Sequence, residues 1–425
     1  MFALKVYYQG ELVGVVSQIN NSNYCVFRYD NEFIKKGIEL CPLLMPLNKT
    51  NYLFENLDFE SFKGLPPLLA DSLPDKYGTA LLFAYQKMYG KATLSSLEAL
   101  SYIGKRGMGA LEFVPSLHKN ELDEQKTIEI ESLIEVAKKV LSEKENISFK
   151  LDEALLKDLI SVGSSIGGAR AKAIVAIDRE GHIKSGQIGG LKNHKYAILK
   201  FDGLGADLTE EKNVTYYTRL EYAYYLMARD CGIEMTDSNL IKSNGKYHFL
   251  TNRFDRDING NKIHMLSLSG LAGFDFRKMG TYSYEEVATI IRQLGSGHHD
   301  LKQLYTRMVF NVINKNHDDH VNNISFIMDK DGQFHLSPAY DLTYSYNPQG
   351  EWTRSHQMSI NGKVDQINKN DLLLAGKTMG LSDKEIQTII HKVNSSSKQF
   401  LSFSKLAQLP KEVANQIYQQ LIFLE

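Results

Sequence analysis

The spacing of apolar residues in this 425-residue chain changes from strand-like in its first part to helical in its last part. Short apolar runs at residues 3–8, 13–16 and 24–29 are separated by turn-forming residues, a pattern typical of an antiparallel hairpin or meander. Near the other end, Ser382 and Glu385 form a capping box in front of a helical stripe. The chain is therefore predicted to have an α+β fold: a β-rich N-terminal module, a mixed lobe and a helical C-terminal lobe.

The middle of the chain alternates between the two kinds of pattern. A charged stretch over residues 119–150 predicts a solvated helix and a connection, with a domain boundary near residue 145. Beyond it we expect helices over 215–230 and 301–312, strands over 173–177, 195–201 and 247–254, and a hairpin pairing 324–328 with 334–336.

Composition excludes several classes of protein. Lys and Arg number 49 against 50 Asp and Glu, so a stand-alone nucleic-acid binder is not favoured. Three cysteines, Cys25, Cys41 and Cys231, form neither a disulfide framework nor a zinc-site spacing. No signal peptide and no apolar run long enough to span a bilayer is found. We therefore expect a soluble, cytoplasmic protein.

A glycine-rich segment, Gly163-Ser-Ser-Ile-Gly-Gly168, lies between a predicted helix and a predicted strand. Glycines allow consecutive backbone N–H groups to approach phosphate oxygens closely. The segment is not a Walker A loop, because Ala173 rather than Ser or Thr follows Lys172. A phosphate-binding loop and an ordinary tight turn both fit this pattern.

Lys200 ends an apolar strand pattern, and Glu221 lies on the next predicted helix. In kinases a strand lysine of this kind contacts the ATP phosphates and is oriented by a helix carboxylate. The alternatives are a surface lysine at a strand edge and a glutamate on a solvated helix face.

A polar cluster, His317-Asp-Asp-His-Val-Asn-Asn323, directly follows a core helix pattern. Asp318 precedes Asn323 by five residues, the spacing of a phosphotransfer loop in which Asp accepts the hydroxyl proton and Asn binds Mg²⁺. Asp341, beyond the next hairpin, is the expected second oxygen ligand for Mg²⁺. His320 is placed to act as a cation near the transferred phosphoryl group. One polar surface loop would also give this composition.

Taken in order, these segments resemble the HipA-like serine/threonine kinase toxins of bacterial type II toxin–antitoxin systems. The matching segments are residues 164–172, 253–256, 316–325, 336–342, 64–74 and 108–113. The resemblance implies a protein-kinase-like two-lobed fold with an extra β-rich N-terminal subdomain. The implied domains are a HipA-like N-terminal domain (1–145), a kinase N-lobe (146–256) and a helical kinase C-lobe (257–425).

The resemblance also implies site residues for ATP and Mg²⁺. Asp318 is the expected catalytic base, with Lys200 and His320 acting at the phosphates, and Asn323 and Asp341 are the expected metal ligands. Ser165 matches the family's inhibitory autophosphorylation site. The expected nucleotide-binding residues are Gly167, Gly168, Ala169, Arg170, Ala171, Lys172, Lys200, Glu221, Asn252, Arg253, Phe254, Asp255, His320, Asn323, Tyr340 and Asp341.

The partners implied by the resemblance are a protein substrate, of which an aminoacyl-tRNA synthetase is the family's best-known class, and a helix-turn-helix antitoxin. DNA would be contacted only through the antitoxin complex, and no membrane is expected. Two other functions remain open from the sequence. One is a metal-dependent phosphohydrolase with His317, Asp318 and His320 as ligands, and the other is a catalytically inactive co-repressor.

Overall fold

The computed structural model describes residues 2–88, 93–117, 131–135, 137, 170–203 and 216–424. The chain divides into two units. The first unit comprises Met1–Thr215, Ile241–Leu266 and Gly270–Gly273, and the second comprises Tyr216–Leu240, Ser267–Ser269 and Phe274–Glu425.

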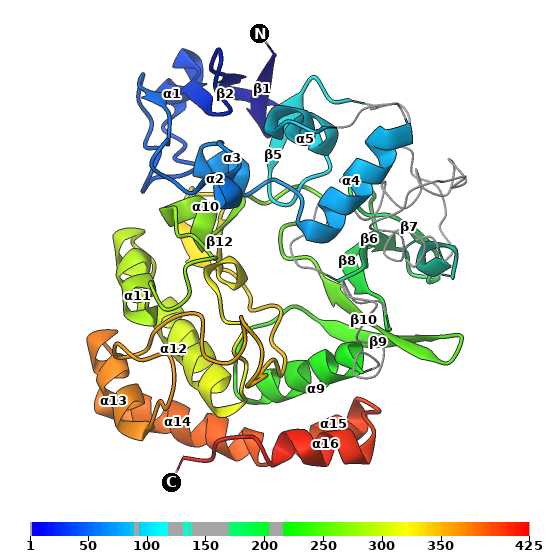
Figure 1. The fold of residues 1–425 in the computed structure, drawn as a ribbon, viewed down its shortest axis with the longest axis vertical. Helices are drawn as coiled ribbons and strands as arrows, with labels where there is room; N and C mark the ends of the chain where they lie inside the picture. Colours follow the sequence, from blue (N-terminus) through cyan, green and yellow to red (C-terminus); the bar gives the residue numbers. More distant parts are fainter. Residues whose placement is uncertain are drawn as a thin grey trace. The chain divides into compact units, whose positions relative to one another are not determined.

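A five-stranded antiparallel sheet forms the N-terminal part of the first unit (Figure 1). Its strand order is β4-β3-β2-β1-β5. Gln9 and Gly10 both have positive φ, at 50° and 84°, and so form the tight hairpin turn between β1 and β2. This arrangement confirms the predicted meander. The strands are β1 (Ala3–Tyr8), β2 (Glu11–Gln18), β3 (Cys25–Tyr29), β4 (Asn51–Tyr52) and β5 (Leu111–Val114).

A second sheet in this unit has the order β7-β6-β8-β10-β9. Its strands are β6 (Lys172–Ile177), β7 (Ile183–Ser185), β8 (Lys195–Lys200), β9 (Ser238–Ser243) and β10 (Lys246–Asn252). Helix α4 (Lys76–Met88) packs against it, with Tyr77 and Leu81 in one buried cluster with Ala173 and Val175. Apolar burial of this kind is the main stabilising contribution to such a contact. The short helices of the first unit are α1 (Asn31–Lys36), α2 (Phe59–Phe62), α3 (Pro67–Ala70) and α5 (Ser96–Ile103).

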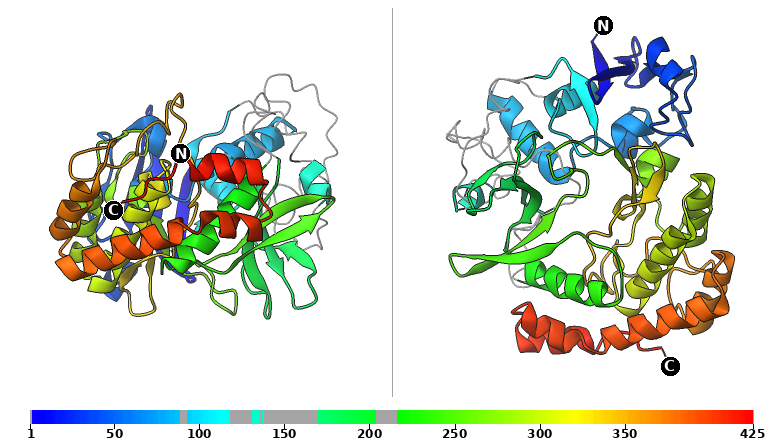
Figure 2. Two further views of the ribbon diagram at one scale, coloured as in Figure 1. Left: turned by 90° about the horizontal axis from the view of Figure 1, so that it is seen from below. Right: turned by 180° about the vertical axis from the view of Figure 1, so that it is seen from behind.

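The second unit is mainly helical. Figures 1 and 2 show α11 and α13 beside the long helices α12 and α14. Helix α12 is the core helix, because nearly all of its side chains are buried, Leu304, Tyr305 and Met308 completely. The helices are α9 (Tyr217–Asp230), α11 (Tyr284–Gln293), α12 (His298–Ile313), α13 (Lys369–Thr378), α14 (Asp383–Ser397), α15 (Phe400–Leu406) and α16 (Lys411–Tyr418).

The hairpin that follows α12 pairs β12 (Ser325–Met328) with β13 (Phe334–Leu336), as the sequence predicts. The chain passes from the first unit to the second through β11 (Met265–Ser267) and α10 (Leu268–Ala272). The capping box of Ser382 and Glu385 at the start of α14 is present.

The α+β fold class is confirmed, and most predicted elements lie where expected. One strand is shorter than predicted: β10 ends at Asn252 instead of Phe254, because the next residues turn into a buried polar network described below. The predicted boundary near residue 145 lies outside the described residues, so the domain limits stay predictions. Among the described helices, none is both long and apolar enough to cross a membrane.

Candidate active site

The polar loop at residues 314–323 begins where α12 ends. Asn314 closes the helix by donating from its backbone N–H and its Nδ2 to the Phe310 carbonyl, at 2.9 and 3.0 Å. Lys315 then takes a left-handed conformation, with φ at 54°, which prevents the helix from continuing. The polar residues after it are therefore directed out of the helix and into a loop.

The two neighbouring aspartates of this loop have different environments. The Asp318 side chain is 47% exposed, whereas that of Asp319 is 1% exposed. Asp319 accepts hydrogen bonds from the Tyr284 hydroxyl at 2.9 Å, from His356 Nδ1 at 2.8 Å and from the Gln357 amide at 2.8 Å. Burial by itself would raise the pKa of Asp319, but His356 and these hydrogen bonds lower it. Only Asp318 is therefore accessible to a substrate hydroxyl.

A chain of hydrogen bonds, partly buried at Ser345 and fully buried beyond it, holds the backbone of Asp318 in place. Its amide donates to Ser345 Oγ at 2.9 Å, and this hydroxyl donates to Asn316 Oδ1 at 3.1 Å. Asn316 Nδ2 donates to Asn311 Oδ1, and Asn311 Nδ2 donates to the Tyr284 hydroxyl, both at 2.9 Å. The loop is thereby tied to α11 and α12, so its backbone is fixed before any substrate arrives.

The predicted metal ligands are connected through their neighbours. The Asn323 Nδ2 donates to the Asp318 carbonyl at 2.7 Å, which leaves the amide oxygen of Asn323 as the available ligand. The Tyr340 hydroxyl donates to the Asn322 carbonyl at 2.7 Å. Because Tyr340 precedes Asp341 and Asn322 precedes Asn323, this bond links the two segments that carry the predicted ligands. An amide oxygen and a carboxylate are ligands that suit Mg²⁺. The residues present therefore fit a Mg²⁺ site.

His320 lies beside Asp318, with 3.7 Å between His320 Nε2 and Asp318 Oδ1. Its ring lies 6.2 Å from that of Phe276, and its carbonyl accepts the Asn323 amide at 2.9 Å. The structure thus brings Asp318, His320 and Asn323 together on one short loop.

His317 is buried and faces away from solvent, with its ring 4.3 Å from that of His356 and 4.9 Å from that of Tyr346. Burial, together with the His356 ring, lowers the pKa of His317 to about 4. His317 is consequently neutral near pH 7 and acts in packing.

The stability of the protein should fall as the pH is lowered from about 6.5 to about 4. In this window the unfolded chain binds a proton at His317 that the folded chain does not, which favours unfolding. The contribution of His317 is on the order of 3 kcal/mol across the full window. Chemical denaturation at several pH values should show a flatter pH dependence for His317→Gln, and an unchanged slope would contradict the assignment. His264, buried in the first unit with its pKa lowered to about 4, contributes in the same direction.

The nucleotide-binding residues predicted from the glycine-rich segment are only partly described. Gly167, Gly168, Ala169 and Ser165 lie outside the described residues. Arg170 is half-buried, and the buried Ala171 accepts the Phe201 amide at 3.2 Å through its carbonyl.

Lys172 and Lys200 are directly opposite each other on β6 and β8. Residues in this register point to the same face of a sheet. Lys172 is buried and forms an ion pair with Asp75, while Lys200 Nζ lies 5.9 Å from the centre of the Phe249 ring. The structure therefore brings two of the predicted phosphate contacts together.

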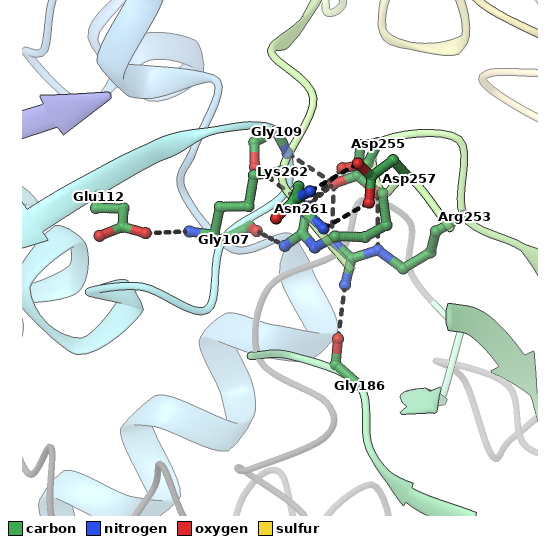
Figure 3. A network of polar contacts seen from close by, with 10 residues as sticks. Gly107, Gly109, Glu112, Gly186, Arg253, Asp255, Asp257, Asn261 and Lys262 are labelled. Carbon is green, nitrogen blue, oxygen red and sulfur yellow. Dashed lines mark hydrogen bonds and ion pairs between the residues drawn. The ribbon is translucent and has the colours of Figure 1, made fainter. Parts of the chain in front are cut away.

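The segment after β10 forms a buried ion network around Asp255 (Figure 3). Arg253 binds this carboxylate in bidentate fashion through Nε at 2.8 Å and Nη2 at 2.7 Å, and Arg256 Nη1 binds it at 2.8 Å. The Gly109 amide, from the N-terminal part of the unit, also donates to Asp255 at 2.8 Å. Burial would raise the pKa of Asp255, but the two guanidinium groups hold it well below its usual range. The side chain of Asp255 is thus fully occupied by protein groups.

This network limits how the segment could hold adenine. The Arg253 amide donates to the Tyr196 carbonyl at 2.8 Å and is already used within the protein. The resemblance implies that backbone groups of Asn252 to Phe254 hold the adenine of ATP, and this amide of Arg253 is therefore not available for that contact. The Asp255 and Arg256 side chains instead join this segment to the Gly107–Gly109 loop, and Arg253 donates to the Gly186 carbonyl.

Glu221 lies on α9 and is buried, so the alternative of a solvated helix face is wrong. It belongs to the second unit and Lys200 to the first, and their predicted pairing stays a prediction.

The phosphohydrolase alternative requires a cluster of metal ligands around residues 317–320. Within the part of the chain that the structure describes, the one grouping of three such side chains at ligand spacing is Asp178, Glu180 and His182, on a hairpin turn. His298 and His299 pair with separate glutamates, Glu385 and Glu234. The described residues therefore give that alternative no shared ligand set.

The sequence did not reveal several residues of this site. Ser345 and His356 act through contacts between distant positions, and no local pattern marks them. Asp319 lies in the predicted polar cluster, but its buried role depends on such distant contacts. Asp75 carries a weak local signal, because an Asp after Pro74 is a common helix start. Its pairing with Lys172 could not be read from that signal.

Two separate segments of the chain match domain models of the HipA-like proteins. Residues 4–114 match the model of the HipA N-terminal domain, and residues 164–400 match that of the HipA-like C-terminal domain. A protein of Haemophilus influenzae named "Putative kinase" is 27% identical over 153 residues. That match covers 33% of this chain and only 44% of the relative's own length.

The fold is similar to that of HipA from the toxin–antitoxin system of Shewanella oneidensis, solved in a complex with HipB and operator DNA. The TM-score is 0.68 at 16% identity, and the match covers 98% of this chain and 95% of that one. At this identity the likeness concerns the fold alone. Since the C-terminal domain model alone spans more than half of its length, the chain belongs to the HipA family.

Proposed function

We propose that this protein is an ATP-dependent serine/threonine protein kinase and the toxin of a toxin–antitoxin pair. The observation that carries the proposal is the half-exposed carboxylate of Asp318, which lies five residues before Asn323. Hydrogen bonds with Ser345 and Asn323 hold the backbone of this loop in place. The buried Asp319 has no comparable access, so the loop presents one base and not two.

In the proposed reaction, Asp318 accepts the proton of a serine or threonine hydroxyl as its oxygen attacks the γ-phosphorus of ATP. The bond between the γ-phosphorus and the β,γ-bridging oxygen breaks, and ADP leaves. Asn323 and Asp341 would hold Mg²⁺, which when bound neutralises charge on the β- and γ-phosphates. Lys172 and Lys200 bind the phosphates, and His320 lies beside the base, where a protonated imidazole would stabilise the transferred group.

The partners are proposed on family grounds. The protein substrate is of the aminoacyl-tRNA synthetase class, and a helix-turn-helix antitoxin binds the toxin and links it to DNA. The related HipA of Shewanella oneidensis, seen with HipB and operator DNA, supports an antitoxin partner of this kind.

Measurements of metal content, of Mg-ATP binding and of ATP turnover on the purified chain separate this proposal from the phosphohydrolase and the inactive co-repressor. A kinase should bind Mg-ATP and contain no tightly held transition metal by elemental analysis. A phosphohydrolase should retain such a metal and release free phosphate, and an inactive co-repressor should not turn over ATP at all. Either of the last two outcomes would contradict the proposal.

We also propose that Ser165 is an autophosphorylation site that switches the enzyme off. A phosphoserine adds about −1.5 to −2 charges near neutral pH, which would repel ATP phosphates from the glycine-rich segment. Mass spectrometry after incubation with Mg-ATP should find phosphate on Ser165 in the wild type and not in Asp318→Asn. ATP affinity should fall as the modification accumulates. An unmodified Ser165, or an affinity that does not change, would exclude the switch and leave the kinase proposal standing.

A further inference from the structure

Lys172 forms a buried ion pair with an aspartate far away in the sequence. Its Nζ lies 3.1 Å from Asp75 Oδ2, and the two side chains are 3% and 8% exposed. Burying a charged group is costly unless it is paired, so this contact stabilises both side chains in their buried positions. Asp75 is itself fixed, because its Oδ1 accepts the Gly78 amide at 2.6 Å, as the N-cap of a helix does.

Packing of α4 explains why these two residues meet. Tyr77 and Leu81 lie in one buried cluster with Ala173 and Val175 of β6. Asp75 immediately precedes α4, so docking of the helix brings this carboxylate to the start of β6. The contact joins the stretch matched by the N-terminal domain, residues 4–114, to the stretch matched by the C-terminal domain.

The neighbourhood of Lys172 is suited to an anion of high charge. Lys172 and Lys200 face each other across two paired strands, and like charges in directly opposite positions destabilise a sheet. Asp75 offsets one of these charges. The phosphates of a nucleotide would add opposite charge here, in agreement with the predicted role of both lysines.

We propose that Asp75 is a positioning residue, which holds the Lys172 ammonium group in the correct orientation for the phosphates of ATP. The N-terminal domain thereby contributes to nucleotide binding through a residue that does not itself contact the nucleotide. The inference rests on the proposed kinase function.

Two opposing effects would follow from removing the Asp75 charge. The loss of a negative charge would by itself favour binding of an anion. Against this, the Lys172 ammonium group would lose the ion pair that orients it, so it would meet the phosphates in a poorer geometry. We expect the second effect to dominate, because Lys172 is almost fully buried.

The test compares the affinities of the full chain for Mg-ATP and for adenosine, by calorimetry. For Asp75→Asn we expect Mg-ATP affinity to fall about tenfold or more, the value of a charge-assisted hydrogen bond, with adenosine affinity unchanged. Adenosine has no phosphates, so a general loss of structure would lower both affinities together. Asp75→Glu, which keeps the carboxylate, should recover most of the ATP affinity.

Glu112→Gln provides the matched control. Glu112 Oε1 pairs with Lys262 Nζ, also at 3.1 Å and also between the two matched stretches, but on β5, which belongs to a different sheet from β6 (Figure 3). This variant should bind Mg-ATP like the wild type. If Asp75→Asn does not fold, the variant Asp75→Leu/Lys172→Met, which removes both charges, should bind adenosine and bind Mg-ATP no more weakly than Lys172→Met alone.

Several outcomes would overturn the inference. ATP affinity that rises or stays constant in Asp75→Asn would mean that Asp75 competes with phosphate or has no role in its binding. Equal losses for ATP and adenosine would make the role of Asp75 structural, as would additive losses in the double variant. A wild-type protein that does not bind Mg-ATP would instead refute the proposed function, so the two failures are distinguishable.

Discussion

Asp318→Asn should lose phosphotransfer activity by a factor on the order of 10²–10⁴, the usual contribution of a general base. Asparagine keeps the shape of the side chain but cannot accept the hydroxyl proton. The loop should keep its conformation, since the contacts that hold it come from the Asp318 backbone, to Ser345 and Asn323. Rates of phosphate transfer and Mg-ATP affinity from calorimetry should therefore separate, with the affinity largely unchanged.

A control variant on the surface tests whether the loss of activity comes from Asp318 itself or from the loss of one negative charge. Asp331→Asn changes the same kind of group on the exposed turn between β12 and β13. It should transfer phosphate at the wild-type rate. Near-wild-type turnover by Asp318→Asn would refute the assignment of the base, and an equal loss in Asp331→Asn would show that the effect is one of net charge.

Replacing the predicted metal ligands should have the second large effect. Asn323→Ala or Asp341→Ala should lower activity by about 100-fold or more, because charge on the phosphates would no longer be offset. Asn323→Ala also removes the hydrogen bond to the Asp318 carbonyl, so the two variants are compared.

The dependence of ATP affinity on Mg²⁺ shows whether the loss of activity in these variants comes from a lost metal site. The affinity of the wild type for ATP should rise when Mg²⁺ is added, and that of Asp341→Ala should respond weakly, while both bind ATP similarly in the presence of EDTA. A double variant, Asn323→Ala/Asp341→Ala, with an unchanged affinity for Mg-ATP would place the metal elsewhere.

The sequence predicts the elements of this fold well where local signals act alone. Turn residues separate β1 from β2 and β12 from β13, and apolar spacing marks α12, so these elements follow from contacts within a few residues. The end of β10 was placed two residues too late. Phe254 favours a longer strand, whereas the hydrogen bond from the distant Gly109 amide to the Asp255 carboxylate accompanies the end of the strand at Asn252.

In the candidate site, too, local features can be predicted from the sequence and contacts between distant residues cannot. The spacing of Asp318 and Asn323 lies within one loop and can be read from the sequence. The burial of Asp319 depends on His356 and Tyr284, which are 37 and 35 residues away, and Lys172 meets Asp75 across 97 residues. Pairings of this kind arise from tertiary packing, and a single sequence carries no record of them.

Transfer of labelled γ-phosphate from ATP to protein tests the central claim most directly. The purified full chain would be incubated with Mg-ATP and a nucleotide-depleted bacterial lysate, and labelled proteins would be hydrolysed and examined for phosphoserine and phosphothreonine. We predict label on these residues with the wild type, one ADP released for each phosphate transferred, and none of this with Asp318→Asn. Release of free phosphate without labelled protein, or label that persists undiminished with Asp318→Asn, would contradict the account.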